Sequence, residues 1–236
     1  MSNTTQLGLP LVQAAQAQKH VTVNEAFLRL DGLVNLVLQS ASTAMPPALA
    51  ADGACYSVPV GAVNAWAGQE GLIAIRSIGG WDFAEPARGW RAFILDRGVG
   101  AIFDGANWRE GFATLSPHAA GVSLSVAEID HVIAAGAVST TGFVIPSNAV
   151  VIGVTGRVTA PITGTLTSWS LGNPGAVGRF GTGIGLGVGA WVRGVLAQPT
   201  AFYAPQVLQL DAVGGSFAAG SVRFAVHFMQ IALPDL

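Results

Sequence analysis

One segment of the chain, residues 19–38, has the only long helical pattern in the sequence, and it limits what the remaining residues can form. Its apolar residues recur at spacings of four, three, four and three, which is a heptad seam. The seam residues are Val23, Phe27, Leu30, Val34 and Val37. Thr22 and Glu25 have the spacing of a capping box, which predicts that the helix begins at Thr22. Gly32 costs a helix about 1 kcal/mol relative to alanine, so its presence indicates close packing.

Two interpretations of this helix are open. The seam predicts an oligomerisation helix, a stalk that holds several copies of the chain together. An amphipathic helix that lies on a sheet of its own chain would show the same spacing. The seam lasts roughly two and a half heptads, whereas a coiled coil is typically identified from three or four.

The scarcity of charge bears on the class of protein. Charged residues make up 10% of the chain, against a typical value of about 25%. We therefore expect much of the surface to face sister subunits. The net charge of −2 argues against a nucleic-acid partner, which needs a basic face. The longest uncharged run, residues 132–156, contains Pro146 and several polar residues, so no membrane insertion is predicted.

The amino terminus and the few metal-binding residue types give further expectations. The first residues carry neither a basic start nor an apolar core, which predicts no signal peptide and synthesis in the cytoplasm. The single cysteine, Cys55, excludes an intrachain disulfide and a cysteine-based zinc site. The four histidines lie far apart in the sequence, so we predict no metal site and no cofactor.

Residues 52–112 have the pattern of a small β unit rich in tryptophan and glycine. Asp52-Gly53 and Asp104-Gly105 are turn signals, and in each motif an aromatic residue follows four residues after the aspartate. Residues 40–51, which contain two consecutive prolines, are predicted to link this unit to the helix. The expected strands of the unit are 55–58, 72–77, 81–83, 90–96 and 100–103.

The remaining residues predict a connector at 113–135, in which residues 122–135 are either helical or extended, and an antiparallel, jelly-roll-like β-sandwich at 136–236. Alternating apolar runs are separated there by turn residues at the spacing of a sandwich. The runs are 150–158, 166–171, 189–195, 206–213 and 222–232. The predicted fold class is thus mainly β: an anchor and short α-helical stalk at residues 1–40, the unit at 52–112, the connector, and the sandwich.

A set of motifs between residues 7 and 110 carries a family resemblance. The motifs are Leu9-Pro10-Leu11, Ala15-Gln16-Ala17-Gln18-Lys19-His20-Val21-Thr22-Val23-Asn24-Glu25-Ala26, Asp52-Gly53-x-x-Tyr56, Trp66-Ala67-Gly68-Gln69, Gly80-Trp81-x-Phe83, Gly89-Trp90-Arg91-Ala92 and Phe103-Asp104-Gly105-x-x-Trp108. Together they resemble an uncharacterised family of alphaproteobacterial phage and gene-transfer-agent proteins, whose members are described as tail-fibre or head-spike components.

This resemblance implies a part of a virion, located at the particle surface. It implies an amino-terminal anchor that contacts other virion proteins and a short helical stalk, so it favours the oligomerisation helix. It also implies β domains that present a receptor-binding tip. Fibres of this kind are usually homotrimers built on short coiled coils, whereas a spike base at a capsid vertex would be a pentamer.

We therefore expect a structural and receptor-binding fibre or spike that attaches to cell-surface polysaccharide. Tryptophan and tyrosine rings stack on sugars. With an anchor at the amino terminus, the sandwich is the expected tip, and its candidate glycan-binding residues, chosen by aromatic type alone, are Trp169, Trp191 and Tyr203. The alternative is a purely structural adaptor or spike base that holds another fibre.

A polysaccharide depolymerase is the third hypothesis. Glycoside hydrolysis needs two carboxyl groups about 5–10 Å apart. The available carboxylates in the tryptophan-rich unit are Asp82, Glu85, Asp96, Asp104 and Glu110. Aspartate beside glycine in a turn usually hydrogen-bonds the backbone instead. We therefore predict no catalytic residue and a protein that is not an enzyme.

Overall fold

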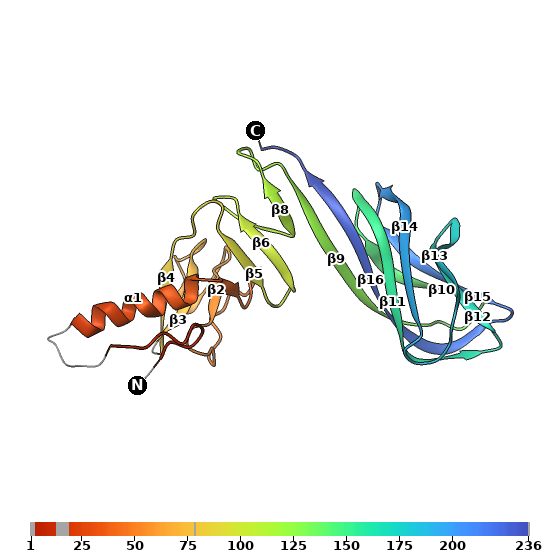
Figure 1. Ribbon diagram of the computed structural model, residues 1–236, viewed down its shortest axis with the longest axis horizontal. Helices are drawn as coiled ribbons and strands as arrows, with labels where there is room; N and C mark the ends of the chain where they lie inside the picture. The colour runs from red at the N-terminus through yellow and green to blue at the C-terminus, as the bar shows by residue number, and fades with distance from the viewer. Residues whose placement is uncertain (1–2, 13–18, 78, 236) are drawn as a thin grey trace. The chain divides into compact units, whose positions relative to one another are not determined.

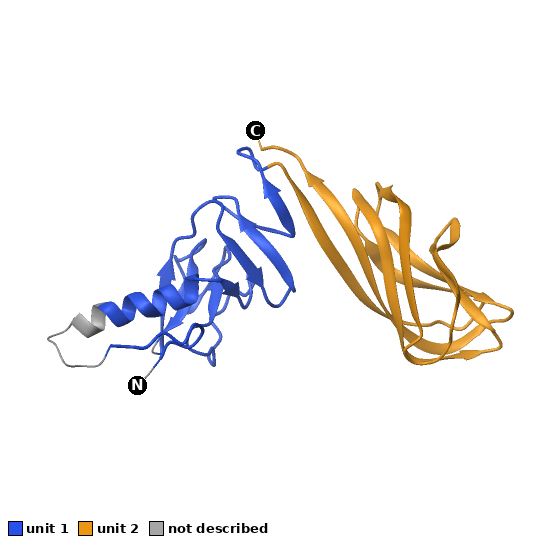
Figure 2. Ribbon diagram, in the orientation of Figure 1, with its two compact units in different colours: residues 1–119, 236 blue, residues 120–235 orange. Residues whose placement is uncertain are grey.

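The computed structural model of the chain describes residues 3–12, 19–77 and 79–235, with backbone only for residues 19–22. Two compact units, residues 1–119 and residues 120–235, make up the chain (Figure 2). The described residues are mainly in β-strands, with one α-helix near the amino terminus (Figure 1). This confirms the mainly β prediction. Residues 1–2 and 13–18 of the predicted anchor lie outside the described residues.

A seven-stranded sheet, in the order β4-β3-β2-β1-β5-β6-β7, forms the first unit. The strands are β1 (Val37–Leu38), β2 (Cys55–Ser57), β3 (Ile73–Ser77), β4 (Gly80–Ala84), β5 (Arg91–Ile94), β6 (Val99–Phe103) and β7 (Trp108–Glu110). A short 3-10 helix, η1 (Asn64–Trp66), and strand β8 (Phe112–Leu115) complete the elements of this unit. All five strands that were predicted between residues 55 and 103 are present, with bounds shifted by at most two residues.

Helix α1 (Lys19–Leu33) differs from the prediction at both ends. Because residues 19–21 are already helical, Thr22 is not the residue before the first turn, and the predicted capping box is wrong. The helix ends at Leu33, and Asn35 follows with a left-handed φ of 52°, a conformation that commonly terminates helices. The chain then turns into β1, so Val37 belongs to the sheet rather than to the helix.

Strand β1 lies at the centre of the sheet, which corrects the prediction of a separate anchor and stalk at residues 1–40. It pairs in parallel with β2 on one side and β5 on the other, where Leu38 is in register with Cys55 and Ile94. All three side chains are fully buried. Gly32 of α1 packs on the same core, since a Cβ there would lie 3.1 Å from Cys55 Sγ and from Ile75 Cγ2. The close packing predicted at Gly32 is thus confirmed.

Two four-stranded antiparallel arrangements face each other in the second unit. One has the order β10-β15-β12-β13, and in the other β14, β11, β16 and β9 are neighbours in that order (Figure 1). The strands are β9 (Gly121–Val132), β10 (Val138–Ile145), β11 (Ala149–Gly164), β12 (Ser168–Asn173), β13 (Ala176–Ile184), β14 (Trp191–Phe202), β15 (Gln206–Val213) and β16 (Phe217–Ala232). Residues 121–132 are therefore a twelve-residue strand and not part of a connector.

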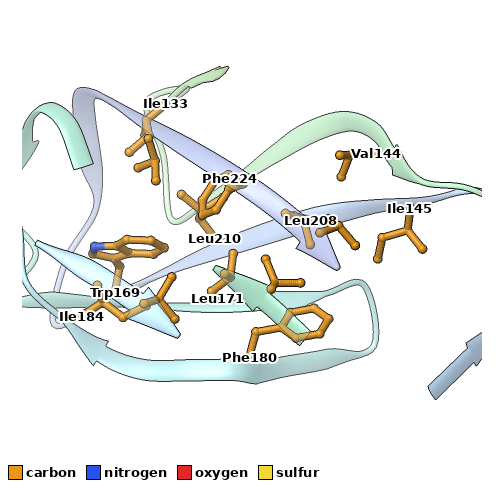
Figure 3. Packing of buried hydrophobic residues seen from close by; sticks show 14 of the residues in the cluster. Ile133, Val144, Ile145, Trp169, Leu171, Phe180, Ile184, Leu208, Leu210 and Phe224 are labelled. Carbon is orange, nitrogen blue, oxygen red and sulfur yellow. The ribbon is translucent and has the colours of Figure 1, made fainter. Parts of the chain in front are cut away.

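The core of the second unit lies between these two sheets, which confirms a β-sandwich. Trp169 and Leu171 of β12 and Leu210 of β15 approach Phe224 of β16 from the opposite layer (Figure 3). The ring centroids of Trp169 and Phe224 are 6.2 Å apart, in an edge-on arrangement that aromatic pairs favour. The alternate residues of these strands face outward.

Candidate functional site

A shallow groove of about 620 Å³ lies on the outer face of the sandwich, across β14, β11, β16 and β9. Its lining combines an exposed aromatic ring with charged and hydroxyl-bearing side chains. The side chains that point outward into it are Glu128, Thr155, Arg157, Thr159, Trp191, Arg193, Arg223 and Ala225. The groove is built entirely on strands, which hold functional side chains more rigidly than loops do.

Strand register brings these residues together from distant parts of the sequence. Arg157 of β11 pairs with Trp191 of β14 on one side and with Arg223 of β16 on the other. Arg223 in turn pairs with Asp130 of β9. We call this cross-strand set the tryptophan row: Trp191, Arg157, Arg223 and Asp130. Two residues further along the strands, and therefore on the same face, runs a second row of Arg193, Thr155, Ala225 and Glu128.

Small residues leave the space between the two rows that forms the groove. Ala225 stands between Thr155 and Glu128 in the second row, so short side chains lie at its centre. Gly156, between Arg157 and Thr155, faces the core, where a Cβ would lie only 2.6 Å from the ring of Phe224. Glycine at that position leaves room for the ring of its cross-strand partner Phe224, which lies on the core side of the sheet beneath the groove.

Charges in the groove are distributed unevenly. The Arg223 guanidinium donates two hydrogen bonds, of 2.7 and 2.8 Å, to the Asp130 carboxylate. The pKa of Asp130 is lowered by this hydrogen bonding with Arg223, and the same pair raises the pKa of Arg223. Within the described part of the chain, Arg157 and Arg193 have no carboxylate in ion-pair contact. The Arg193 guanidinium instead lies 5.7 Å from the centre of the Trp191 ring.

Only one of the three predicted glycan-binding residues lies in the groove. The Trp191 side chain is 62% exposed, whereas Trp169 is 1% exposed and is a core residue whose indole N–H donates to the Gly185 carbonyl. The prediction for Trp169 is therefore wrong. Tyr203 is exposed but follows the last residue of β14, whereas Trp191 is its first residue. On the neighbouring strand β11, Trp191 is paired with Arg157 and Phe202 with Ala149, eight residues or roughly 26 Å apart, so the two rings do not share a site.

The five residues of the predicted oligomerisation helix lie in three different parts of the fold. Val23, Phe27 and Leu30 lie on α1, and Val23 and Leu30 are more than a third exposed. Val34 is exposed in the turn after the helix, and Val37 is half-buried in β1. The predicted seam is thus shorter than expected, because the chain leaves the helix for the sheet after Leu33.

Two of the five carboxylates considered for hydrolysis, Asp104 and Glu110, are held by structural partners. The Asp104 carboxylate accepts hydrogen bonds from the backbone N–H groups of Ala106 and Asn107 and from Arg109. Glu110 pairs with Arg97 at 3.0 Å. Among the described side chains, no group of three or more histidine, cysteine, aspartate or glutamate residues could hold a metal ion. Within the same described residues, no helix combines the length and the apolar character needed to cross a membrane.

Sequence reasoning missed most of the groove. Arg157, Arg223, Asp130 and Thr155 were not singled out, because only the pairing of three separate strands places them together. A local signal did exist for the tryptophans. Trp169 alternates in phase with Leu171, which marks a core face, whereas Trp191 is in phase with Arg193, which marks a solvent face.

One comparison with known proteins, the family match, falls in the first unit. Residues 23–109 match the model of a family described as a protein of unknown function, DUF2793. Among solved structures, the Cyanophage Pam1 capsid asymmetric unit is similar to part of the chain, with 21% identity and a TM-score of 0.30 over 50% of this chain and 98% of that chain. No curated protein matches. The family match covers less than half of the chain and describes no activity, and a TM-score of that size does not establish a common fold.

Proposed function

We propose that this chain is a non-enzymatic structural and receptor-binding protein of a phage-like particle, such as a gene transfer agent, and that it attaches to host cell-surface polysaccharide. The observation that carries the proposal is the groove on the sandwich, where the 62% exposed ring of Trp191 lies beside guanidinium and hydroxyl groups. Sugar rings stack their C–H faces on aromatic rings and exchange hydrogen bonds with such polar groups. An open groove suits one stretch of a long polymer.

The topology of the second unit supports the proposal, since we infer that the sandwich is a jelly roll. Numbered from β9, its eight strands occur as first-eighth-third-sixth in one sheet and second-seventh-fourth-fifth in the other. Two interleaved Greek keys produce this order, and viral capsid and lectin domains are among the proteins built on it. Fold alone does not assign function, so this support is by analogy, as is the resemblance of the amino-terminal motifs.

The proposal that the protein is not an enzyme rests on the carboxylates. A glycosidase needs one carboxyl group that is free to donate a proton and a second that faces the same sugar. Asp104 instead accepts three hydrogen bonds from its own turn and Arg109. Among the residues that line the groove, Glu128 is the only carboxylate, and the neighbouring Asp130 is held by Arg223.

A binding experiment with the full chain tests the proposed function. An array of bacterial surface polysaccharides is probed with the wild type, with Trp191→Ala and with Tyr203→Ala, which removes an exposed aromatic ring outside the groove. We expect Trp191→Ala to weaken binding at least about tenfold and Tyr203→Ala to leave it unchanged. Equal binding by the wild type and Trp191→Ala, or no binding to any polysaccharide, would contradict the proposal.

A purely structural adaptor or spike base is the alternative, and an apolar region of the same sheet face favours it. Leu124 and Val126 of β9 and Ile231 of β16 are 53%, 55% and 79% exposed. Contiguous apolar surface on a sheet often marks a contact with another protein. An adaptor would assemble with its partners normally when Trp191 is replaced, and it would fail when Leu124 and Val126 are replaced by charged residues.

We further propose that the protein works as a homo-oligomer at the particle surface. A trimer fits a fibre and a pentamer fits a spike base, with other virion proteins contacted through the amino-terminal region. Support comes from the low charge of the chain and from the exposed apolar residues Val23 and Leu30 on α1. Light scattering of the purified chain measures the number of copies directly.

A further inference from the structure

We propose that the groove binds an acidic polysaccharide, and that the carboxylate of a uronic acid unit lies against Arg157 and Arg193 while its sugar ring contacts Trp191. This inference rests on the proposed function, because it names the class of sugar for the same site. It follows from the distribution of charge in the two rows.

Two arginines of the groove face each other across neighbouring strands. Arg157 and Arg223 are paired residues of β11 and β16 on the outer face, where directly opposed side chains have Cβ atoms about 4.5–5.5 Å apart. Like charges in that position repel each other. Asp130 neutralises Arg223 through two hydrogen bonds, but Arg157 has no carboxylate partner among the described residues. A bound anion would supply the partner that Arg157 lacks.

The second step concerns Arg193. It lies two residues after Trp191 on β14, so it is a diagonal neighbour of Arg157 on the same face. Two guanidinium groups and one indole ring therefore converge at the β14-β11 end of the groove. The acidic side chains, Glu128 and Asp130, lie at the other end on β9. The negative charge of an acidic sugar is therefore favoured at the β14-β11 end of the groove.

The third step selects a carboxylate sugar over other polyanions. A guanidinium group presents paired donors that match the two oxygens of a carboxylate. The hydroxyl groups of Thr155 and Thr159 lie in the same groove and suit sugar hydroxyls. A nucleic acid would instead need a basic surface that tracks many phosphates, and the chain has a net charge of −2.

The test compares acidic and neutral polysaccharides that share a backbone. Polygalacturonate, alginate and hyaluronate are each paired with their carboxyl-reduced forms, and dextran sulfate is paired with dextran. Binding of the full chain is measured for the wild type, Arg157→Gln, Arg193→Gln and the matched control Arg179→Gln, whose exposed arginine lies on β13 near Phe202 and outside the groove.

We expect at least one uronate polymer to bind, with its reduced form binding at least about tenfold more weakly. Arg157→Gln and Arg193→Gln should each weaken binding of the acidic form about tenfold, lower the sensitivity of that binding to salt, and leave binding of the reduced form unchanged. Arg179→Gln should match the wild type.

Other outcomes separate the two proposals. If acidic and reduced forms bind equally and Trp191→Ala abolishes both, the groove binds polysaccharide but the acidic assignment is wrong. Binding to dextran sulfate without binding to any uronate polymer overturns the carboxylate assignment. Binding to none of the eight polymers overturns this inference, whereas the proposed function is overturned only if no polysaccharide of the bacterial array binds either.

Discussion

The side-chain hydroxyl of Thr4 donates a 2.7 Å hydrogen bond to the carboxylate of Asp31, which lies on the last turn of α1. The backbone N–H groups of Gln6 and Leu7 donate to the same carboxylate, at 2.8 and 2.5 Å. An acidic group near a helix carboxyl terminus is unfavourable by itself, because the helix dipole is negative there. The donors of the amino-terminal arm, residues 3–12, offset that cost and fix the arm to the first unit.

Replacing Asp31 by alanine should release the arm. Three donors would lose a charged acceptor, which costs about 1.5–3 kcal/mol for a single such bond. The released donors would bond to water, and the unfavourable charge at the helix end would be removed, so we expect a net loss of roughly 2–3 kcal/mol in the first unit. Hydrogen exchange followed by mass spectrometry locates the loss in residues 3–12 and in β1 to β3. The control is Asp96→Ala, which removes an exposed aspartate of the same unit. Unchanged protection of the arm in Asp31→Ala would contradict the prediction.

The same carboxylate predicts how stability depends on pH. Burial by itself raises the pKa of Asp31, but the hydrogen bonds from Gln6, Leu7 and Thr4 outweigh burial and lower it below its ordinary value. The stabilisation is therefore complete above the unfolded-state pKa of about 3.9 and is lost as the pH falls through the lower folded pKa. The difference in urea midpoint between the wild type and Asp31→Asn should be constant from pH 5 to 7 and narrow below about pH 4. A difference in urea midpoint that does not narrow would show that the charge of the Asp31 carboxylate is not the source of the stabilisation.

Gly32→Ala tests whether space or helix propensity dominates at the end of α1. Alanine favours a helix by about 1 kcal/mol over glycine. The new Cβ would however lie 3.1 Å from Cys55 Sγ and Ile75 Cγ2, two buried side chains with little room to move. We expect a net destabilisation of about 1–2 kcal/mol. In a Cys55→Ala background the Sγ contact is absent, so the same substitution should cost less, and equal costs in both backgrounds would show that the two residues do not interact.

Strands with an ordinary alternation were predictable, and strand 206–213 was placed with its observed bounds. Strand β9 was missed because the alternation in its first half is reversed. Its outward side chains include Leu124 and Val126, while Ser123 and Ser125 point to the other face. Sequence patterns assume that apolar residues face the core, and an exposed apolar face breaks that assumption.

The helix and the site failed for a different reason. Apolar residues at positions 34 and 37 continue the helical spacing, and only the pairing of Leu38 with Cys55 and Ile94 decides that this stretch becomes a strand. The groove likewise depends on the register of Arg157 with Trp191 and Arg223. Contacts between residues this far apart in the sequence are not encoded in local periodicity, so a single sequence predicts the strands but not their neighbours.

The two tryptophans of the second unit should respond oppositely to substitution. Trp169→Ala would empty a fully buried site between the two sheets, and such changes cost about 3–5 kcal/mol. Trp191→Ala removes a mostly exposed ring and should change stability by less than about 0.5 kcal/mol. Urea unfolding measures both. A large loss of stability in Trp191→Ala would mean that the ring is structural, and its effect on polysaccharide binding could then not be assigned to direct contact.

Assembly of the chain is best tested with single substitutions, because the fold rules out a simple deletion of the amino-terminal residues. Deletion of residues 1–40 would remove the central strand β1 together with Asp31, so a change of mass after deletion could result from unfolding. Leu30→Glu instead places a charge on the exposed side of α1, where the side chain is 47% exposed in one copy. If α1 joins the subunits, this charge should lower the mass measured by light scattering toward that of a monomer while the circular dichroism spectrum stays unchanged. The comparison variant is Val126→Glu, which tests the alternative interface on the apolar part of the outer sheet face. A loss of assembly in Val126→Glu alone would place the interface on the sandwich, and a monomeric wild type would contradict both sites.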